Sequence, residues 1–336
     1  MNKFLETDIA EITQAFPNAP FDDTSVLVTG GAGFLGSWMC DALHSMGARV
    51  TCLDNLSSGR IENISHLQDH SNFHFIHHDI TNPLSLKVPF DYVIHMASRA
   101  GPFEFAQYPI EILMTNTLGT KHALEIAKKN DAGFLFTSTS EIYGNAQIIP
   151  TPETYFGNVN TIGPRGCYDE AKRCAEALCL AYVREYDVSV RIVRIFNTYG
   201  PRIRSDGIYG RVIPRFLDQA MKNEPITVFG DGSQTRSFTY VTDQIIWQLK
   251  LLLSDVRNGE VVNIGNNHEL TVLDLAHLVL EQTESRSEII FQDLPKDDPI
   301  RRNPDIMKAQ KLLDWKPKVD IGNGLDKMMS AILFDS

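Results

Sequence analysis

A tyrosine and a lysine, Tyr168 and Lys172, are spaced so that they could work together as an acid–base pair. Positions i and i+4 lie on one face of a helix, so the phenol and the ammonium group would point into the same space. A nearby cation favours the phenolate and lowers a phenol pKa that is normally near 10. Such a tyrosine could take a proton from a substrate hydroxyl while hydride leaves the carbon. The alternative is an ordinary amphipathic surface helix.

The stretch FTSTSEIYG, residues 136–144, begins as an apolar strand and ends in hydroxyl groups and a carboxylate. Ligands of open α/β sheets bind at the carboxyl ends of the strands, so Thr139, Ser140 and Glu141 would face a binding site. Thr139 or Ser140 could hydrogen-bond the same substrate oxygen as Tyr168. An uncompensated carboxylate at such a place is costly to desolvate, which favours a role for Glu141 in the site.

A glycine-rich turn, with Gly30, Gly33 and Gly36, joins the first apolar strand to a helix. Glycines at this spacing allow a tight turn and close approach of the backbone to a pyrophosphate, and the helix N-terminus supplies N–H donors. Asp54 ends the next strand, where a carboxylate accepts ribose hydroxyls and repels a 2′-phosphate, which favours NAD over NADP. The alternatives are a plain strand–helix turn and a capping role for Asp54 with Asn55.

The tyrosine–lysine pair, the hydroxyl groups and the glycine-rich turn can form one site only if a sheet brings them together, and the sequence predicts such a sheet. Short apolar strands alternate with helices, so we expect an α/β fold with a doubly wound, mostly parallel sheet covered on both faces. The expected strands cover residues 26–28, 49–54, 73–77, 92–97, 134–138 and 190–196, and the expected helices cover 36–47, 109–129 and 167–186.

After Asn197 the alternation stops and Gly, Pro and Arg become frequent. We expect helices near 212–222, 271–284 and 306–313 (the last one), and strands at 226–229 and 260–265. The predicted division is an N-terminal extension (1–21), a dinucleotide-binding domain (22–197, with a return segment at about 235–265) and a smaller, discontinuous α/β substrate-binding domain (198–234 and 266–330).

The composition excludes several classes of function. The 336 residues carry a net charge of −11, which disfavours a nucleic-acid partner. Five cysteines without a CxxC pair, no signal peptide and no run of roughly 20 apolar residues predict a cytoplasmic protein outside the membrane. Histidines such as His77 and His78 show no ligand spacing, so we expect no metal.

In these motifs the chain resembles the extended short-chain dehydrogenase/reductase family, whose fold is of the Rossmann type. Within it, the chain is most similar to the UDP-glucuronate decarboxylases (UDP-xylose synthases). The resemblance covers about residues 24–330. It rests on the segments VTGGAGFLGS, TSTSEIYG, GPRGCYDEAKR, RIFNTYGPR, GDGSQTRSFTYV and RRNPDI. In the decarboxylases a Thr/Ser-Ser-Glu triplet replaces the Thr-Asp-Glu of sugar 4,6-dehydratases, and this chain has Thr139-Ser140-Glu141.

The resemblance implies a role for each matching residue. Tyr168 and Lys172 would be the base and its helper, Ser140 and Glu141 would handle the proton at C5 of the sugar, and Arg302 would act in decarboxylation. The implied NAD-binding residues are Gly30, Gly33, Phe34, Leu35, Gly36, Asp54, Asn55, Asp79, Ile80, Ala97, Ser98, Asn116, Tyr168 and Lys172. The implied substrate-binding residues are Arg99, Glu141, Asn197, Arg211, Thr227, Phe229, Arg236 and Arg302.

Some of these residues have simpler explanations. Arg236 and Arg302 could be solvated or paired with Asp297 and Asp298, and Asn197 could cap a strand end. The loop at residues 98–103 reads SRAGPF, whereas the decarboxylases carry a Ser-Pro-Ala-Ser-Pro-Pro-like loop. Arg99 in this loop could bind a uronate carboxylate, or it could indicate a different sugar or outcome.

The expected reaction is therefore NAD-dependent decarboxylation of UDP-glucuronate to UDP-xylose through a 4-keto intermediate. One alternative is a UDP-glucuronate or UDP-glucose 4-epimerase, and another is a non-catalytic NAD-binding regulator. The helices near 109–129 and 167–186 carry apolar residues on more than one face, which predicts a homodimer. These residues are Ile112, Leu113, Leu118, Leu124, Ala175, Leu178, Leu180, Ala181 and Val183.

Overall fold

A parallel seven-stranded sheet organises the computed structural model, which describes residues 3–204, 211–294 and 300–335. The strand order is β11-β6-β5-β4-β1-β2-β3, so the chain winds outward from β1 in both directions. This is the doubly wound order expected of a dinucleotide-binding fold. The strands are β1 (Ser25–Thr29), β2 (Arg49–Asp54), β3 (Phe73–His77), β4 (Tyr92–His95), β5 (Gly133–Thr139), β6 (Val190–Ile195) and β11 (Glu260–Ile264).

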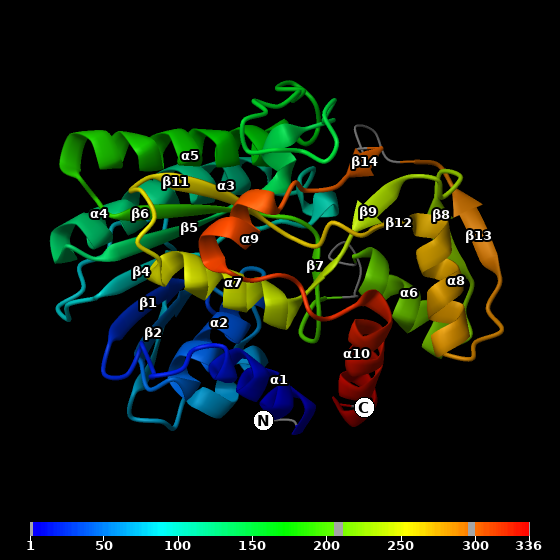
Figure 1. Ribbon diagram of the computed structural model, residues 1–336, viewed down its shortest axis with the longest axis horizontal. Coiled ribbons are helices and arrows are strands. Elements are labelled where there is room, and N and C mark those ends of the chain that lie inside the picture. Colours follow the sequence, from blue (N-terminus) through cyan, green and yellow to red (C-terminus); the bar gives the residue numbers. More distant parts are fainter. Residues whose placement is uncertain (1–2, 205–210, 295–299, 336) are drawn as a thin grey trace.

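Helices cover both faces of this sheet (Figure 1). One face carries α1 (Lys3–Gln14), α2 (Phe34–Ser45) and α7 (Val241–Leu253). The other carries α3 (Pro109–Met114), the π-helical turn η4 (Thr115–Gly119), α4 (Thr120–Asn130) and α5 (Gly166–Tyr186). The short 3-10 turns are η1 (Ile61–Asn63), η2 (Ser65–Leu67), η3 (Pro102–Glu104) and η5 (Ser140–Tyr143).

Side chains along each strand alternate between two cores. In β5, Leu135 packs into the core under α1, α2 and α7, whereas Phe134 and Phe136 pack into the core under α4 and α5. In β1, Val26 and Val28 face the first core and Leu27 faces the second. Because successive side chains of a strand point to opposite faces, a sheet covered on both sides needs apolar residues at every position. This explains the unbroken apolar runs in the sequence.

A smaller group of elements lies beside the carboxyl ends of the sheet, at the right of Figure 1. It holds the pairs β13-β8 and β10-β7 and the sheet β12-β9-β14. Its strands are β7 (Thr198–Tyr199), β8 (Ile226–Phe229), β9 (Thr235–Ser237), β10 (Thr239–Tyr240), β12 (Glu269–Thr271), β13 (Ile289–Gln292) and β14 (Arg301–Arg302). Its helices are α6 (Val212–Met221) and α8 (Val272–Gln282).

Two helices were not anticipated from the sequence. The first is α7, and the second is α10 (Ile321–Asp335), which follows the helix α9 (Met307–Leu313) that we expected to be the last. The return strand at 260–265 is confirmed as β11, which pairs in parallel with β6. The beginning of the expected return segment differs, because β9 pairs with β12 and β14 instead of the main sheet.

The helices α1 and α10 pack against each other, although they lie at opposite ends of the sequence (Figure 1). Asp8 of α1 accepts hydrogen bonds from the Tyr240 hydroxyl (2.6 Å) and from Nζ of Lys327 in α10 (2.7 Å). Lys327 also contacts Glu11 at 3.1 Å. The helix α1 within the expected N-terminal extension is therefore packed on the main body, and Asp8 is the buried charge at this contact.

Candidate active site

A cleft opens along the carboxyl ends of the parallel strands, and the glycine-rich turn forms one wall of it. Gly30 has φ +71°, and a Cβ there would lie 2.6 Å from Cα of Ala97. A Cβ at Gly36 would lie 2.0 Å from the carbonyl oxygen of Gly30. Both positions therefore require glycine, and the backbone at the start of α2 is open to a phosphate group.

Most of the residues expected to bind NAD line this cleft. They are Gly30, Gly33, Phe34, Leu35, Gly36, Asp54, Asn55, Asp79, Ile80, Ala97, Ser98, Tyr168 and Lys172. Asn116 differs, since it is fully buried in η4 and its Nδ2 donates to the carbonyl of Ile112 at 2.8 Å, while the neighbouring Thr115 reaches the cleft.

The carboxylate of Asp54 is held at the edge of the cleft where β2 ends. Its oxygens accept backbone N–H bonds from Ala32 (3.0 Å) and Leu56 (2.8 Å). Burial raises the pKa of Asp54, and these two bonds act in the opposite direction. Each carboxylate oxygen can accept a second hydrogen bond, so ribose hydroxyls could still be bound. The glycine turn and this carboxylate together fit a dinucleotide.

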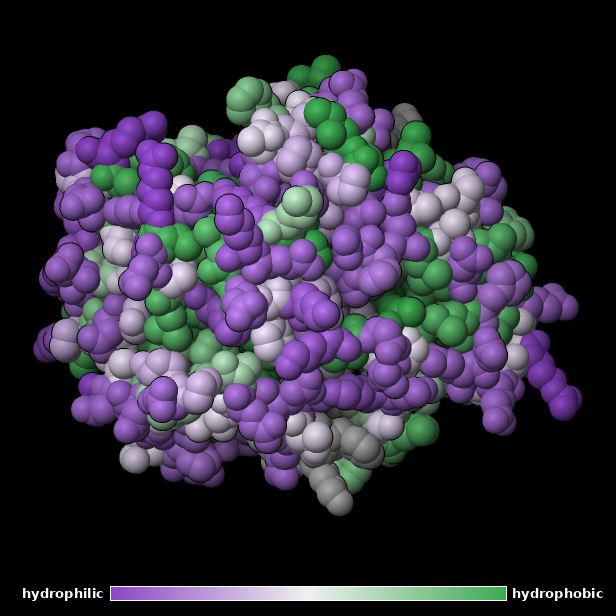
Figure 2. Space-filling view, in the orientation of Figure 1, coloured by the Kyte–Doolittle hydropathy of each residue, from purple (hydrophilic) through white to green (hydrophobic). Residues whose placement is uncertain are grey.

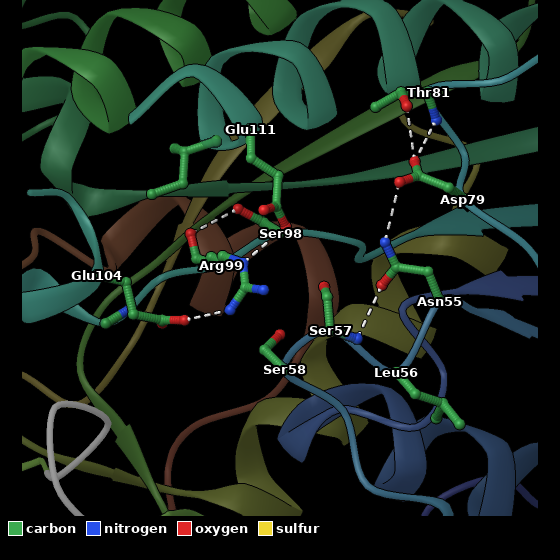
Figure 3. Close-up of polar contacts among 12 residues, drawn as sticks. Asn55, Leu56, Ser57, Ser58, Asp79, Thr81, Ser98, Arg99, Glu104 and Glu111 are labelled. Carbon is green, nitrogen blue, oxygen red and sulfur yellow. Dashed lines mark hydrogen bonds and ion pairs between the residues drawn. The ribbon is translucent and has the colours of Figure 1, made fainter. Parts of the chain in front are cut away.

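The following loop is fixed by a short chain of polar contacts, shown in Figure 3. Asn55 donates to Asp79 at 3.1 Å and accepts from the backbone N–H of Ser57 at 3.0 Å. Asp79 in turn accepts from the hydroxyl of Thr81 at 2.7 Å. Asn55 and Asp79 thus shape the cleft wall next to Asp54.

Tyr168 and Lys172 both lie in the cleft, but their protonation differs from our expectation. Burial raises the pKa of Tyr168 to about 12, and a hydrogen bond with Thr139 acts against this rise. Burial lowers the pKa of Lys172 to about 7, and its Nζ donates to the carbonyl of Thr137 at 2.7 Å. The prediction of a lowered tyrosine pKa is therefore wrong for this structure, because burial outweighs the hydrogen bond with Thr139 and the charge of Arg211, which both lower the pKa.

Glu141 is bound by two arginines at the end of β5. Arg302 donates to both carboxylate oxygens, at 2.7 Å for the Nη2–Oε2 contact, and Arg165 donates to Oε2 as well. Burial disfavours the charge, but the two guanidinium groups hold the pKa of Glu141 well below its usual range. Ser140 and Thr139 lie beside Glu141 in the same cleft wall. Glu141 is thus a fixed anion next to Tyr168.

Arg99 lines the cleft as part of an ion-pair cluster (Figure 3). Its Nη1 donates to Glu104 at 2.8 Å and its Nε donates to Glu111 at 2.7 Å, and the guanidinium lies 4.2 Å from the centre of the Tyr108 ring. These contacts fix the loop after β4. A direct contact of Arg99 with a substrate carboxylate stays a prediction.

The other expected substrate residues divide into two groups. Asn197 and Arg211 line the cleft, and Arg211 donates to the carbonyl of Ala100 at 2.6 Å. Thr227, Phe229 and Arg236 lie on β8 and β9 in the smaller group of elements and are not part of the cleft lining. Thr227 is bonded to Gln219, Phe229 packs 6.4 Å from the Phe103 ring, and Arg236 donates to the carbonyl of Thr235. The alternative partners Asp297 and Asp298 lie outside the described residues.

Sequence reasoning missed Arg165, which binds Glu141, and Arg202, which lines the cleft and pairs with the buried Asp41 at 2.7 Å. Both occur in segments that carried the family resemblance, GPRGCYDEAKR and RIFNTYGPR. The family motifs therefore contained both arginines, but they could not show the ion pairs, because the partners Glu141 and Asp41 lie in other parts of the sequence.

Within the described residues, the His, Cys, Asp and Glu side chains form no group of three or more that could hold a metal ion. No helix in the same residues is long and apolar enough to cross a membrane. On the face shown in Figure 2 the surface is mostly hydrophilic, with apolar residues gathered at the top and right of the view.

The doubly wound sheet, the glycine turn and the tyrosine–lysine pair define a dinucleotide-dependent enzyme of the short-chain dehydrogenase/reductase type. The profile of the NAD dependent epimerase/dehydratase family matches residues 26–265, so the chain belongs to that family. The membership confirms NAD as the cofactor expected from the sequence.

Relatives and solved structures extend this result. The chain is 45% identical over 329 residues to UDP-glucuronic acid decarboxylase 1 of Danio rerio, covering 97% of this chain and 77% of the relative. It resembles a UDP-glucose 4-epimerase of Thermotoga maritima solved with UDP-glucose, with a TM-score of 0.83 and 30% identity. This match covers 93% of this chain and 99% of the epimerase. It also resembles a UDP-glucuronic acid 4-epimerase of Bacillus cereus solved with UDP-glucuronic acid and NAD, with a TM-score of 0.82 and 28% identity. This match covers 93% of this chain and 100% of the epimerase.

Proposed function

We propose that this protein decarboxylates UDP-glucuronate to UDP-xylose, with NAD as its cofactor. The observation that carries the proposal is the pair of buried arginines, Arg165 and Arg302, around Glu141 beside Tyr168. The two arginines give the site a positive charge that can bind a sugar carboxylate, and Tyr168 can exchange a proton with a sugar hydroxyl. The identity to a relative named as a UDP-glucuronic acid decarboxylase supports the same substrate.

Tyr168 is the proposed base for the hydroxyl at C4 of the sugar. Thr139 is bonded to the phenol and can hold the same sugar oxygen in line with it. A phenol with a pKa of about 12 keeps its proton at neutral pH, but only the phenolate can accept a proton from the substrate. Positive charge near the phenol favours the phenolate, so the proton transfer depends on such charge. Lys172, one helical turn away, supplies part of this charge when it is protonated.

When bound, NAD supplies the carbon that accepts a hydride from C4 and later returns it. The sugar oxidised at C4 is a β-keto acid, so the C5–C6 bond can break with release of CO2 and leave an enolate over C4 and C5. In this step Arg302 and Glu141 orient the carboxylate end of the sugar, and Ser140 binds the sugar beside them. C5 then takes up a proton. Asn197, which lines the cleft, is proposed to contact the diphosphate, and Arg211 to lie at the nucleotide end.

The test is incubation of the purified protein with UDP-glucuronate and NAD, with CO2 measured and the nucleotide sugar identified by NMR. We expect CO2 and UDP-xylose in equal amounts. UDP-galacturonate without CO2 would show a 4-epimerase instead, which is the second candidate because solved epimerases share this fold. Binding of NAD without any change in its absorbance on addition of UDP-glucuronate would indicate a non-catalytic regulator.

We also propose a homodimer in the cytoplasm and the division into cofactor and substrate domains given above. Of the residues expected at the dimer surface, Ile112, Leu124 and Ala175 are fully buried within the protomer, whereas Leu113 is exposed. Ile110, Leu113 and Met114 of α3 are exposed and could meet a second copy. A monomeric mass in light scattering at micromolar concentration would refute the dimer.

A further inference from the structure

Four charged side chains from three parts of the chain meet beside Tyr168, and we call them the carboxylate cluster: Glu141, Arg165, Asp169 and Arg302. Arg302 and Arg165 both bind the carboxylate of Glu141. Asp169, in the first turn of α5, interacts electrostatically with the other three. With two guanidinium groups and one fixed carboxylate, the net charge of the cluster depends on Asp169. It is +1 when Asp169 is protonated and 0 when it is ionised.

Asp169 lies in an environment that disfavours its charge. Its side chain is 5% exposed, and its Oδ1 has no hydrogen-bond partner among the described residues. An ionised carboxylate with a buried oxygen that accepts no hydrogen bond is costly. Burial, followed by the charge of Glu141, raises the pKa of Asp169 to about 7.

The charged groups that act on Asp169 come from η5, from the start of α5 and from β14. Glu141 on η5 and Glu170 on α5 favour its protonated form, whereas Arg165 and Arg302 favour its ionised form. Asp169 in turn raises the pKa values of its neighbours on α5, Cys167 and Tyr168. Burial and the two glutamates outweigh the two arginines, because both arginines are already bound to Glu141.

We propose that Asp169 is a positioning residue that works in its protonated form and leaves the carboxylate cluster with one positive charge to receive a single substrate carboxylate. This inference rests on the proposed function, since it assigns the carboxylate of the uronate to this cluster. The incoming carboxylate then makes the cluster neutral. With Asp169 ionised, the same carboxylate would bring an uncompensated negative charge into a buried site, and binding would weaken.

The inference is tested by the pH dependence of substrate affinity. The wild type, Asp169→Asn and the matched control Glu170→Gln are compared at about pH 6 and pH 8.5 in the presence of saturating NAD. For each protein, KM for UDP-glucuronate is measured from CO2 release, and the inhibition constant of UDP-xylose, which lacks the carboxylate, is measured in parallel. Asparagine has the shape of aspartate but stays neutral at both pH values. Glu170 is half-buried and contacts Arg173 at 3.4 Å on the outside of the cluster.

We expect the KM of the wild type to rise by about tenfold or more between the two pH values, because most of Asp169 loses its proton over this range. The rise should be less than about twofold in Asp169→Asn and should persist in Glu170→Gln. The inhibition constant of UDP-xylose should change little in all three proteins. This control also separates Asp169 from Lys172, whose titration would affect both sugars.

Two results would overturn the inference while leaving the proposed function intact. One is a wild-type KM that does not change with pH, and the other is a rise of the same size in Asp169→Asn as in the wild type. A parallel rise for UDP-xylose would also count against it, because the effect would then not depend on the carboxylate. If the wild type releases no CO2 at either pH, the proposed function is wrong and this inference falls with it.

Discussion

Replacing Arg302 with glutamine tests the link between the arginine and decarboxylation, and its neighbour Arg301 provides a matched control. Arg302 is 8% exposed and donates to both oxygens of Glu141, which is 14% exposed. Arg301 is 52% exposed and pairs with Glu269 at 2.6 Å. The two arginines follow each other on β14, so the same substitution removes a buried ion pair in one variant and a surface pair in the other.

The expected losses of stability differ accordingly. Removing one partner of a buried ion pair costs about 3–5 kcal/mol. Since Arg165 stays bound to Glu141, we expect the lower end, about 3 kcal/mol, for Arg302→Gln. A surface pair contributes roughly 0–1 kcal/mol. At about 2 °C per kcal/mol for a large chain, Arg302→Gln should lower Tm by about 6 °C and Arg301→Gln by about 2 °C or less.

The two variants should also differ in which chemical step is affected. In Arg302→Gln, Tyr168 and Lys172 remain, so oxidation at C4 should stay within about tenfold of the wild type. CO2 release should fall on the order of 10²-fold, the size of effect seen when one group that stabilises developing charge is removed. Single-turnover absorbance of the reduced cofactor and CO2 release, measured side by side, give the two rates.

The reasoning is refuted by either of two results. Equal losses of Tm in Arg301→Gln and Arg302→Gln would mean that the buried pair does not stabilise the fold as argued. Oxidation and CO2 release that fall by the same factor in Arg302→Gln would mean that the arginine acts on binding or folding and not on the carboxylate end of the sugar.

Three further predictions concern the cofactor and the acid–base pair. Asp54→Ala should weaken NAD binding and reduce discrimination against NADP, measured by titration of both; unchanged affinities for both would contradict it. Tyr168→Phe should slow hydride transfer by about 10²–10⁴-fold, and a single-turnover rate near that of the wild type would rule out Tyr168 as the base. Lys172→Met should raise Tm at pH 6, because the folded protein holds a charged lysine whose pKa burial lowers to about 7. The cost of that charge is full below pH 7 and disappears as the pH approaches the unfolded value near 10.4, so the gain in Tm should shrink at pH 9; a gain that is equal at both pH values would contradict it.

The main sheet was predictable because its signal is local. Strands buried on both faces are continuous apolar runs, and β2 and β3 begin and end where the sequence analysis placed them. The helix α7 escaped notice for the opposite reason. It is buried on nearly all sides and carries Gln244 and Gln248 within its apolar sequence, so it lacks the one-sided pattern by which helices are recognised.

The chemistry of the site was predictable only in part. Spacing along a helix placed Tyr168 and Lys172 in the same cleft, but spacing carries no information on burial, which sets both pKa values. The contact between Glu141 and Arg302 joins residues 161 positions apart, and only the three-dimensional fold brings them together. The sequence motifs identified this glutamate and this arginine separately, without showing that they bind each other.

The contact between α1 and α10 has a consequence for the order of events during synthesis. Lys327, which neutralises Asp8, is synthesised 319 residues after it. Until then the apolar face of α1, with Leu5, Ile9 and Ile12, lacks part of its cover. The final packing of this helix therefore has to wait for the synthesis of α10, and until that point only α2 and α7 can cover it.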